Sequence, residues 1–471
     1  MAASGAVRLG QAHDGSSTST TALRRYRMGV ALFLFAALVF AGGASRADEP
    51  RQIIVRIACV LTLAASAWRL ERPLVSLPGI WRWLGFGAYL PILVQMLPLP
   101  PSWWAILPGH RIYADIARAS GTVAWRPLTL TPDLTLNALL ALLAPTAVVT
   151  VSVFLDTKTR TALWTWIVGA ALFSAGLGLL QLAAEDAPLR FYRETSLNSA
   201  VGIFANRNHQ AALLACAFPV LGALLGTRLQ SQTTLRLLAF ATAAFILLMI
   251  GEFLTGSRAG ALLGLAGAAG GVWAFRASGA RLRGIRGQRL FLACAVGAVV
   301  LIVIAIAASH GGALSRFGHG DPASETRVQM LAPLLHTAGA FFPFGSGFGS
   351  FATVYRQFEP NALLSTIYMN EAHNEPLQLV IEGGLPALVM IAAFLWWWCT
   401  TAAALVRAQL PPARRSMTIA AIVVSAMLMA QSLVDYPLRT PLLAGLFALA
   451  CCEMARAAAY RPRETVRETS I

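Results

Sequence analysis

Long runs of apolar residues recur along the chain, separated by polar connections. Most runs contain roughly 16 to 22 residues, enough for an α-helix to cross a bilayer. The pattern predicts an all-α, polytopic integral membrane protein with about twelve transmembrane helices. These lie at Met28–Gly43, Gln52–Trp68, Gly79–Leu97, Leu134–Leu155, Ala162–Ala184, His209–Gly226, Leu235–Leu254, Ala259–Phe275, Leu290–Ala308, Leu377–Leu405, Met417–Val434 and Pro437–Met454.

The same pattern divides the chain into five parts. Residues 1–27 are rich in Ser, Thr, Ala and Gly and are expected to form a disordered tail. An N-terminal bundle of about nine helices (28–308) precedes a long loop with amphipathic helices (309–376), about three further helices (377–456) and a second tail (457–471). Because Arg24, Arg25 and Arg27 precede a short apolar run, the first helix also resembles a signal peptide, and its retention or cleavage stays open.

Composition supports the membrane assignment. The chain is 57% hydrophobic and 12% charged, and no soluble chain of this length could cover so much apolar surface. The formal charge of +16 would suggest nucleic acid binding in a soluble protein. Here it is explained by the sorting of basic residues between the two faces of the membrane, so no nucleic acid partner is expected.

Lys and Arg concentrate in alternate connections. One set of connections, which includes both termini, holds 23 of the 37 basic residues but only six of the 21 acids. Basic residues resist translocation, so the termini are expected to be cytoplasmic in a bacterial inner membrane. The two longest connections, Pro98–Asp133 and Ser309–Pro376, then lie on the far side of the membrane, which in a Gram-negative cell is the periplasm. Their aromatic and apolar residues indicate that both lie on the membrane, and function is expected on that face.

Two kinds of chemistry are disfavoured. The six cysteines lie in or at the ends of apolar runs without CxxC spacing, so neither a disulfide framework nor a metal site is expected. Asp, Glu, His and Lys are too sparse within the spans to form an ion relay, which argues against an ion-coupled transporter.

Arg258 lies in a connection so short that it forms the turn between two spans. Its planar guanidinium could hold a diphosphate through two parallel hydrogen bonds. An interfacial anchor, whose head group reaches water, explains the residue equally well. Arg258 is therefore one candidate among the basic residues of the outer face.

Arg327 lies in Ser324–Leu331, whose helical spacing gives an apolar edge of Val328, Leu331 and Leu335. The segment is expected to form an amphipathic helix on the membrane surface. An arginine on such a helix most often belongs to a solvated face, so Arg327 by itself favours that explanation.

His373 immediately precedes a long apolar span. Asn374 can cap that helix and Pro376 suits its first turn, so His373 would lie where free amide groups favour an anion. A neutral histidine is also a suitable general base for a hydroxyl group. A structural role for a histidine near a cap is somewhat more common.

The glycines around Gly347, in Phe344–Ser350, resemble a phosphate loop only superficially, because no strand precedes them and the motif spacing differs. Tight backbone turns are the simpler interpretation, with an anion-binding nest as the second.

Taken in order, several short motifs resemble the O-antigen ligase family of membrane glycosyltransferases, which includes related polysaccharide polymerases. The resemblance covers roughly Val201 to Leu449. It rests on Gly202–His209, Ser257–Gly260, Thr326–Arg327, Pro343–Phe351, His373–Leu377, Glu382–Pro386 and Asp435–Arg439.

The resemblance implies an enzyme whose catalytic residues are Arg258, Arg327 and His373. It implies a donor glycan on undecaprenyl diphosphate, an acceptor that is a lipid A-core sugar or another glycan, contact with membrane lipids, and no metal or other cofactor. The arginines would neutralise the leaving diphosphate while His373 takes the acceptor proton. Other residues expected to bind substrate are Asn206, Arg207, Asn208, Gly347, Asn374 and Arg439.

Three alternatives stay open at this point. A polymerase would use the same donor with another acceptor. A transporter or flippase for lipid-linked sugars would explain the spans and the basic outer face without catalysis, but it predicts a polar cavity between helices. A scaffold protein predicts that Arg258, Arg327 and His373 lie far apart.

Overall fold

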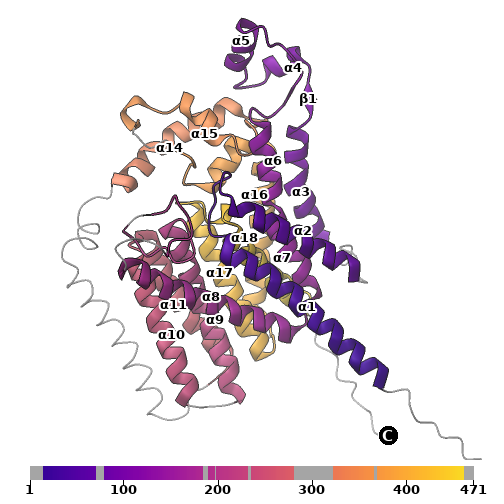
Figure 1. Cartoon of the computed structure of the whole chain (residues 1–471), viewed down its shortest axis with the longest axis vertical. Helices are drawn as coiled ribbons and strands as arrows, with labels where there is room; N and C mark the ends of the chain where they lie inside the picture. Colours follow the sequence, from indigo (N-terminus) through magenta and orange to yellow (C-terminus); the bar gives the residue numbers. More distant parts are fainter. Residues whose placement is uncertain are drawn as a thin grey trace, which may run out of the picture.

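The computed structural model describes residues 14–69, 79–183, 189–196, 198–231, 235–280, 322–364 and 369–460. Most of these residues are helical, which confirms the predicted all-α class. The only strands within these ranges, β1 (Pro98–Leu99) and β2 (Arg126–Pro127), form a short antiparallel ribbon. Figure 1 shows a tall helical bundle with shorter helices at its upper end.

Nine helical stretches in the described ranges are long and apolar enough to cross a membrane. The protein is therefore a multi-pass membrane protein. The nine are α2 (Arg51–Arg69), α6 with α7 (Pro132–Ala141 and Leu143–Phe154), α8 (Thr157–Ala183), α9 (Arg207–Ser231), α10 (Leu235–Leu254), α11 (Arg258–Ala277), α16 (Glu375–Arg407), α17 (Pro412–Ser432) and α18 (Pro441–Ala458).

Two further predicted spans form helices that fall short of this length or composition. Gly79–Leu97 corresponds to α3 (Gly79–Gln95), and Met28–Gly43 forms the second half of α1 (Asp14–Ala41). α1 begins inside the segment 1–27 that was expected to be disordered. The predicted span Leu290–Ala308 lies outside the described residues, so the count of about twelve stays a prediction.

The central contact of the bundle is between α9 and α11, which run parallel. Gly260 of α11 lies beside Ala211, near the beginning of α9, and Gly271 lies beside Phe218, farther along it. A Cβ atom at Gly271 would lie 2.8 Å from the carbonyl oxygen of Phe218, so only glycine allows this approach. Small residues bring membrane helices together in this way, because the backbones can then pack directly.

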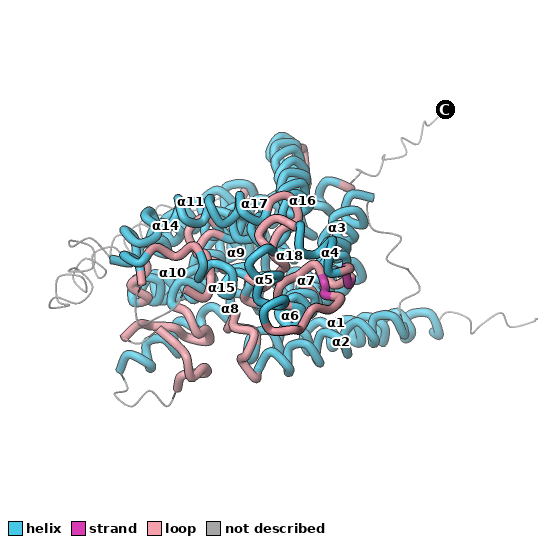
Figure 2. Tube along the Cα trace, turned by 90° about the horizontal axis from the view of Figure 1, so that it is seen from above, coloured by secondary structure: helices cyan, strands magenta, loops and turns pink. Residues whose placement is uncertain are grey.

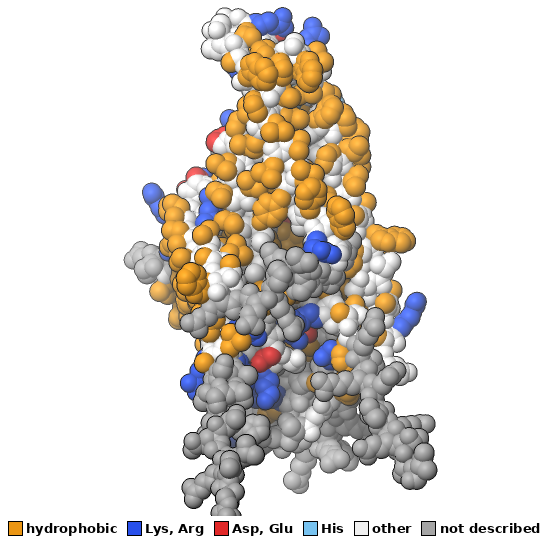
Figure 3. Space-filling view, turned by 90° about the vertical axis from the view of Figure 1, so that its right-hand side faces the viewer, with side chains coloured by type: hydrophobic (Ala, Val, Ile, Leu, Met, Phe, Trp, Pro, Cys, Tyr) orange, Lys and Arg blue, Asp and Glu red, His pale blue; other side chains and the backbone are white. Residues whose placement is uncertain are grey.

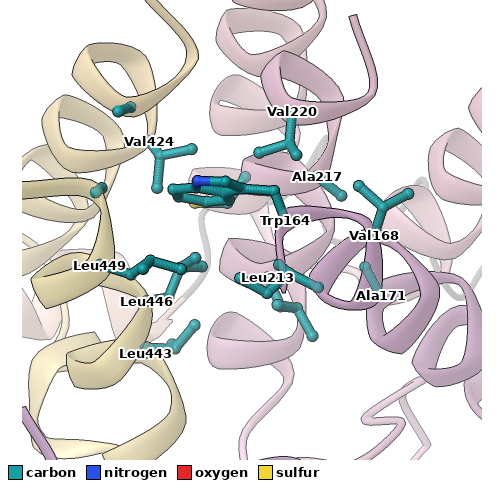
Figure 4. Packing of buried hydrophobic residues seen from close by; sticks show 14 of the residues in the cluster. Trp164, Val168, Ala171, Leu213, Ala217, Val220, Val424, Leu443, Leu446 and Leu449 are labelled. Carbon is teal, nitrogen blue, oxygen red and sulfur yellow. The ribbon is translucent and has the colours of Figure 1, made fainter. Parts of the chain in front are cut away.

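Larger side chains fill the space around this contact. Trp164 of α8 is 1% exposed and lies among α9, α17 and α18 (Figure 4). The figure places Leu213 and Val220 of α9, Val424 of α17 and Leu446 of α18 around the indole. The core thus joins helices from the N-terminal and C-terminal parts of the chain, so neither part forms a closed bundle alone.

The α1–α2 hairpin lies along one edge of the bundle, as both Figure 1 and Figure 2 show. It packs chiefly on α7, and its outward side exposes Ile53, Ile54 and Ile57. Figure 3 shows an apolar covering on the side of the molecule that lies to the right in Figure 1. Among the exposed apolar residues are Trp83 and Phe86 of α3. Such surfaces suit contact with lipid, in which apolar side chains need no protein cover.

Both long connections are folded in their described parts. In the first, α4 (Pro101–Ile106) and α5 (Arg111–Ala119) rise above the bundle and are held by the Nε1 atom of Trp104, which donates to the Pro127 carbonyl at 2.8 Å. The second contains α14 (Pro322–Phe341), α15 (Phe351–Val354), η2 (Tyr355–Gln357) and η3 (Asn361–Leu363).

α14 confirms the helix predicted around Ser324–Leu331 and shows which side packs. Met330 and Leu334 are buried, whereas Leu331 and Leu335 are about half exposed. The apolar edge predicted from the sequence spacing therefore faces away from the protein. α14 packs on α16, and Met330 and Leu334 lie on its buried side.

Candidate active site

Five helices meet at one end of the bundle, which we call the site end. α9, α11, α16 and α18 begin there and α17 ends there. Cross-links support this arrangement: the Nε2 atom of Gln431 in α17 donates to the carbonyl of Asn208 at 2.8 Å, and the hydroxyl of Thr440 lies 2.9 Å from the Nδ1 atom of His209. The connections predicted to share one face of the membrane therefore do lie together.

Two of the predicted arginines occupy equivalent positions. Arg207 and Arg258 are the first residues of the parallel helices α9 and α11, and both are partly buried. The Ser257 side chain caps α11 by accepting from the Gly260 amide at 3.0 Å, and Asn206 Oδ1 accepts from the Asn208 amide at 2.8 Å. Two guanidinium groups thus start two adjacent helices whose dipoles also favour an anion.

His373 is held in an unusual backbone conformation just before α16. Its φ is +50°, in the left-handed region, which costs a non-glycine residue roughly 1–3 kcal/mol. Asn374 is the predicted cap: its side chain accepts from the Leu377 amide at 3.0 Å and donates to the Leu433 carbonyl at 3.2 Å. The cap and its bond to the end of α17 therefore determine where the His373 ring lies.

The His373 ring contacts a carboxylate and a phenol. Its Nδ1 atom lies 3.2 Å from the Oδ1 atom of Asp435, whose side chain is only 2% exposed. When Nδ1 donates to Asp435, the Nε2 atom becomes the proton acceptor. The ring centroids of His373 and Tyr436 are 4.9 Å apart, and His209 lies on the same tyrosine at 5.1 Å.

Tyr436 connects this pair to the start of α9. Burial raises the pKa of Tyr436, and the negative charge of Asp435 raises it further. The phenol is therefore neutral near pH 7, and its oxygen lies 3.5 Å from the Nδ2 atom of Asn206. Asn206, predicted from the sequence to bind substrate, thus contacts the phenol that lies against His373.

Arg439 is surrounded by carboxylates of the protein. Its Nη2 atom lies 3.0 Å from Glu382 and its Nε atom 3.4 Å from Glu371, while its amide donates to Glu375 at 3.0 Å. Burial opposes the charge of Arg439, but Glu371 and Glu382 outweigh it and raise the pKa of Arg439. Burial raises the pKa of Glu371, and the positive charge of Arg439 offsets part of this increase. The guanidinium is thus engaged with the protein, in contrast to a group kept open for ligand.

The loop Phe344–Ser350 supplies hydrogen bonds to carbonyl groups of α16 that lack a partner within the helix. The helix kinks at Gly384, where φ is +59°, and Pro386 lacks the amide that would bond the Glu382 carbonyl. Gly347 donates its amide to that carbonyl at 2.9 Å, and Ser346 donates to Ile381 at 3.0 Å. The Gly347 amide therefore joins two protein segments, which agrees with the tight-turn interpretation of the loop.

Arg327 lies near the beginning of α14, but its side chain lies outside the described part of the structure. Its distance from Arg258 and His373 stays a prediction. Among the described residues, no three His, Cys, Asp or Glu side chains are arranged to hold a metal ion.

Sequence reasoning missed several residues of this site. Asp435, Tyr436 and His209 were not assigned roles, although all three belong to motifs used for the resemblance. The only local signal was an acid placed just after a span. Nothing in the spacing relates it to His373, because two full helices separate the residues along the chain.

Comparison with known proteins gives one family match. Residues 243–392 match the family described as O-antigen ligase. The matched region extends from within α10 into α16 and contains Arg258, Arg327 and His373. It does not include Arg207, Asp435 or Arg439. No curated protein matches the chain.

Proposed function

We propose that this protein transfers a glycan from undecaprenyl diphosphate to an acceptor hydroxyl, and the match of residues 243–392 to the O-antigen ligase family supports the proposal. The observation that carries the proposal is the contact of His373 with Asp435 at the helix end where Arg207 and Arg258 begin α9 and α11. A base and two permanent cations are the groups that glycosyl transfer from a diphosphate needs when cationic side chains neutralise the leaving group.

His373 would act as the general base. Its Nε2 atom takes the proton of the acceptor hydroxyl while the acceptor oxygen forms a bond to the anomeric carbon of the donor. The bond between that carbon and the diphosphate oxygen breaks, and undecaprenyl diphosphate leaves with the electron pair. Asp435 holds the Nδ1 proton of His373 and stabilises the imidazolium that forms, as a buried carboxylate does for a catalytic histidine.

The leaving diphosphate would be held by Arg258 and Arg327, with Arg207 beside them. The amide groups at the starts of α9 and α11 add partial positive charge at the same place. Because an arginine cannot lose its proton at neutral pH, these groups retain full charge throughout the reaction. A divalent metal is then unnecessary, and we propose metal-independent transfer.

Arg439 would take a supporting part. Its ion pairs with Glu371 and Glu382 join the segment before α18 to both the loop and the first half of α16. These ion pairs would hold Asp435 and His373 in fixed positions relative to each other. Asn208 and Gly347 would support the site through their backbone bonds to α17 and α16.

A reconstituted assay would test the proposed reaction. Purified protein in lipid nanodiscs receives a synthetic oligosaccharide on undecaprenyl diphosphate, with EDTA present, and either lipid A-core or free glycan as acceptor. We expect glycan on one acceptor together with released undecaprenyl diphosphate. Transfer to lipid A-core assigns the ligase reaction and chain extension assigns the polymerase. Donor that crosses the membrane unchanged, without transfer, would replace this proposal with a flippase.

The site end would face the periplasm of a bacterial inner membrane, with both termini in the cytoplasm. The distribution of basic residues supports this orientation. Reporter fusions after Arg286 should be cytoplasmic, and fusions near His319 or Pro360 should be periplasmic. A cytoplasmic signal near His319 would reverse the assignment and exclude the proposed periplasmic reaction.

A further inference from the structure

An open cleft of about 360 Å³ lies between the loop before α2 and the first turns of α6. It lies apart from His373 and its partners, none of which line it. The polar lining residues are Asp48, Arg56, Asp133 and Asn137, and leucines such as Leu136 and Leu140 line the remainder. Charged groups of both signs therefore meet apolar side chains in a cleft on the side of the bundle.

Arg56 is the central cation of the cleft. It lies in the second turn of α2, between the outward-facing residues Ile53 and Ile57. One of its terminal nitrogens donates to the side-chain oxygen of Asn137. Its buried Nε atom has no hydrogen-bond partner among the described residues. A charged side chain in an apolar span is costly, so an incompletely paired one indicates a ligand.

The acidic side of the cleft is at its rim. Asp133 lies in the first turn of α6, and two residues separate Asp48 from the start of α2. Two bonds from Arg46, at 2.8 and 2.9 Å, hold the pKa of Asp48 below its ordinary value. Both carboxylates lie next to the start of an apolar helix, which is the depth of lipid headgroups.

We propose that the cleft binds the headgroup of a phospholipid that carries a primary amine, such as phosphatidylethanolamine. The phosphate accepts hydrogen bonds from Arg56, including the unused Nε, and the ammonium lies at Asp133, beside the Arg46–Asp48 pair on the rim. An acyl chain follows Leu136 and Leu140 along α6. This assignment gives Arg56 and Asp133 each an oppositely charged group of the ligand.

The same charges disfavour other lipids. Phosphatidylglycerol offers a phosphate to Arg56 but brings no cation to Asp133, which would repel it. Phosphatidylcholine has the positive charge, but its quaternary nitrogen has no N–H group to donate. Primary amines satisfy both requirements, so binding should discriminate by headgroup.

Lipid binding to the purified full-length protein can be measured by native mass spectrometry with defined lipids of equal chain length. We expect phosphatidylethanolamine to bind about tenfold more tightly than phosphatidylglycerol, with phosphatidylcholine weaker than phosphatidylethanolamine. The difference corresponds to roughly one charge-assisted hydrogen bond. Equal binding of the three lipids, or preference for phosphatidylglycerol, would overturn the proposal.

Variants locate the binding to this cleft. Arg56→Gln removes the cation and Leu136→Trp fills the space without a change of charge; each should weaken phosphatidylethanolamine binding about tenfold or more. Asp133→Asn changes only an exposed rim residue, so it tests the ammonium site even if Arg56→Gln fails to fold. Arg118→Gln, on the exposed side of α5, is the matched control. Undiminished binding to folded Leu136→Trp and Asp133→Asn proteins would refute the site.

Discussion

Buried charges lie at both ends of α18, and the two ends use them differently. The far end is the end of α18 that lies away from the site end, around Glu453. There the side chains of Arg160 and Glu453 are 7% and 9% exposed and form an ion pair at 3.1 Å. Arg456 donates to the Ser152 carbonyl at 2.8 Å. At the site end, a single arginine faces Glu371 and Glu382, with Asp435 paired to His373 nearby.

The difference lies in how the charged groups are paired rather than in burial. At the far end each arginine has a protein partner, the Glu453 carboxylate for Arg160 and the Ser152 carbonyl for Arg456. At the site end the buried Asp435 holds one nitrogen of His373 and leaves the second nitrogen facing away from this partner. A buried ion pair is weak evidence of function by itself. A histidine that a buried carboxylate orients in this way is stronger evidence, because it can accept a proton from a ligand.

Removal of the base gives the largest expected effect. His373→Ala should lower the rate of glycan transfer by roughly 100-fold to 10,000-fold, the contribution of a positioned general base. Donor binding should survive, because the proposed phosphate contacts are elsewhere. Turnover and binding of the undecaprenyl diphosphate donor are measured on protein with confirmed membrane insertion. Near-normal transfer by the folded variant would remove His373 from the mechanism.

A substitution at the far end should lower the stability of the protein and leave its turnover unchanged. Glu453→Ala leaves Arg160 buried without its partner, close to the charge of Arg456, and should cost about 3–5 kcal/mol of stability. Denaturant unfolding in detergent measures this change. The folded fraction should transfer glycan at the normal rate. A stable variant with impaired turnover would show that the far end also serves the reaction.

A smaller effect is expected for the guanidinium geometry at the start of α11. Arg258→Lys keeps the charge but loses the two parallel donors, so transfer should fall about tenfold to a hundredfold. In contrast to His373→Ala, this change should also weaken donor binding. Arg276→Lys, in the last turn of the same helix, is the matched control. Unaffected donor binding would return Arg258 to the role of an interfacial anchor.

The smallest effect is expected when the far-end pair is replaced as a whole. Arg160→Met combined with Glu453→Met removes both charges and fills similar volume, so the change in stability should lie within roughly 1 kcal/mol of zero or be favourable. Thermal unfolding next to the single Glu453→Ala variant measures the difference. A loss as large as that of the single variant would indicate that the pair has a role beyond mutual neutralisation.

Local patterns in the sequence were sufficient for many features. Apolar periodicity located nine spans, because a helix in a membrane needs a continuous apolar run. The cap at Asn374 was predicted correctly, since capping depends on a few consecutive residues. The charge distribution predicted which connections share a face, and the structure brings Arg207, Arg258 and His373 to one end.

Other features depended on contacts between distant segments. α14 packs through Met330 and Leu334 instead of the predicted edge, because α16 determines which side is covered. The Gly347 amide and the Gln95 side chain both donate to the Glu382 carbonyl, which Pro386 leaves without its partner in the helix. Glycines in a sequence indicate a turn, but they do not indicate what the turn contacts.

The sequence by itself thus determined the membrane class, most of the spans, the cap of α16 and the arginines and histidine that lie at one end. Only the tertiary structure decided that Asp435 orients His373, that Tyr436 lies between two histidines, and that carboxylates occupy Arg439. The physical reason is the distance along the chain over which each interaction acts. Hydrophobic periodicity, capping and charge sorting act within one segment, whereas hydrogen bonds between side chains form wherever the packing of α16, α17 and α18 brings them together.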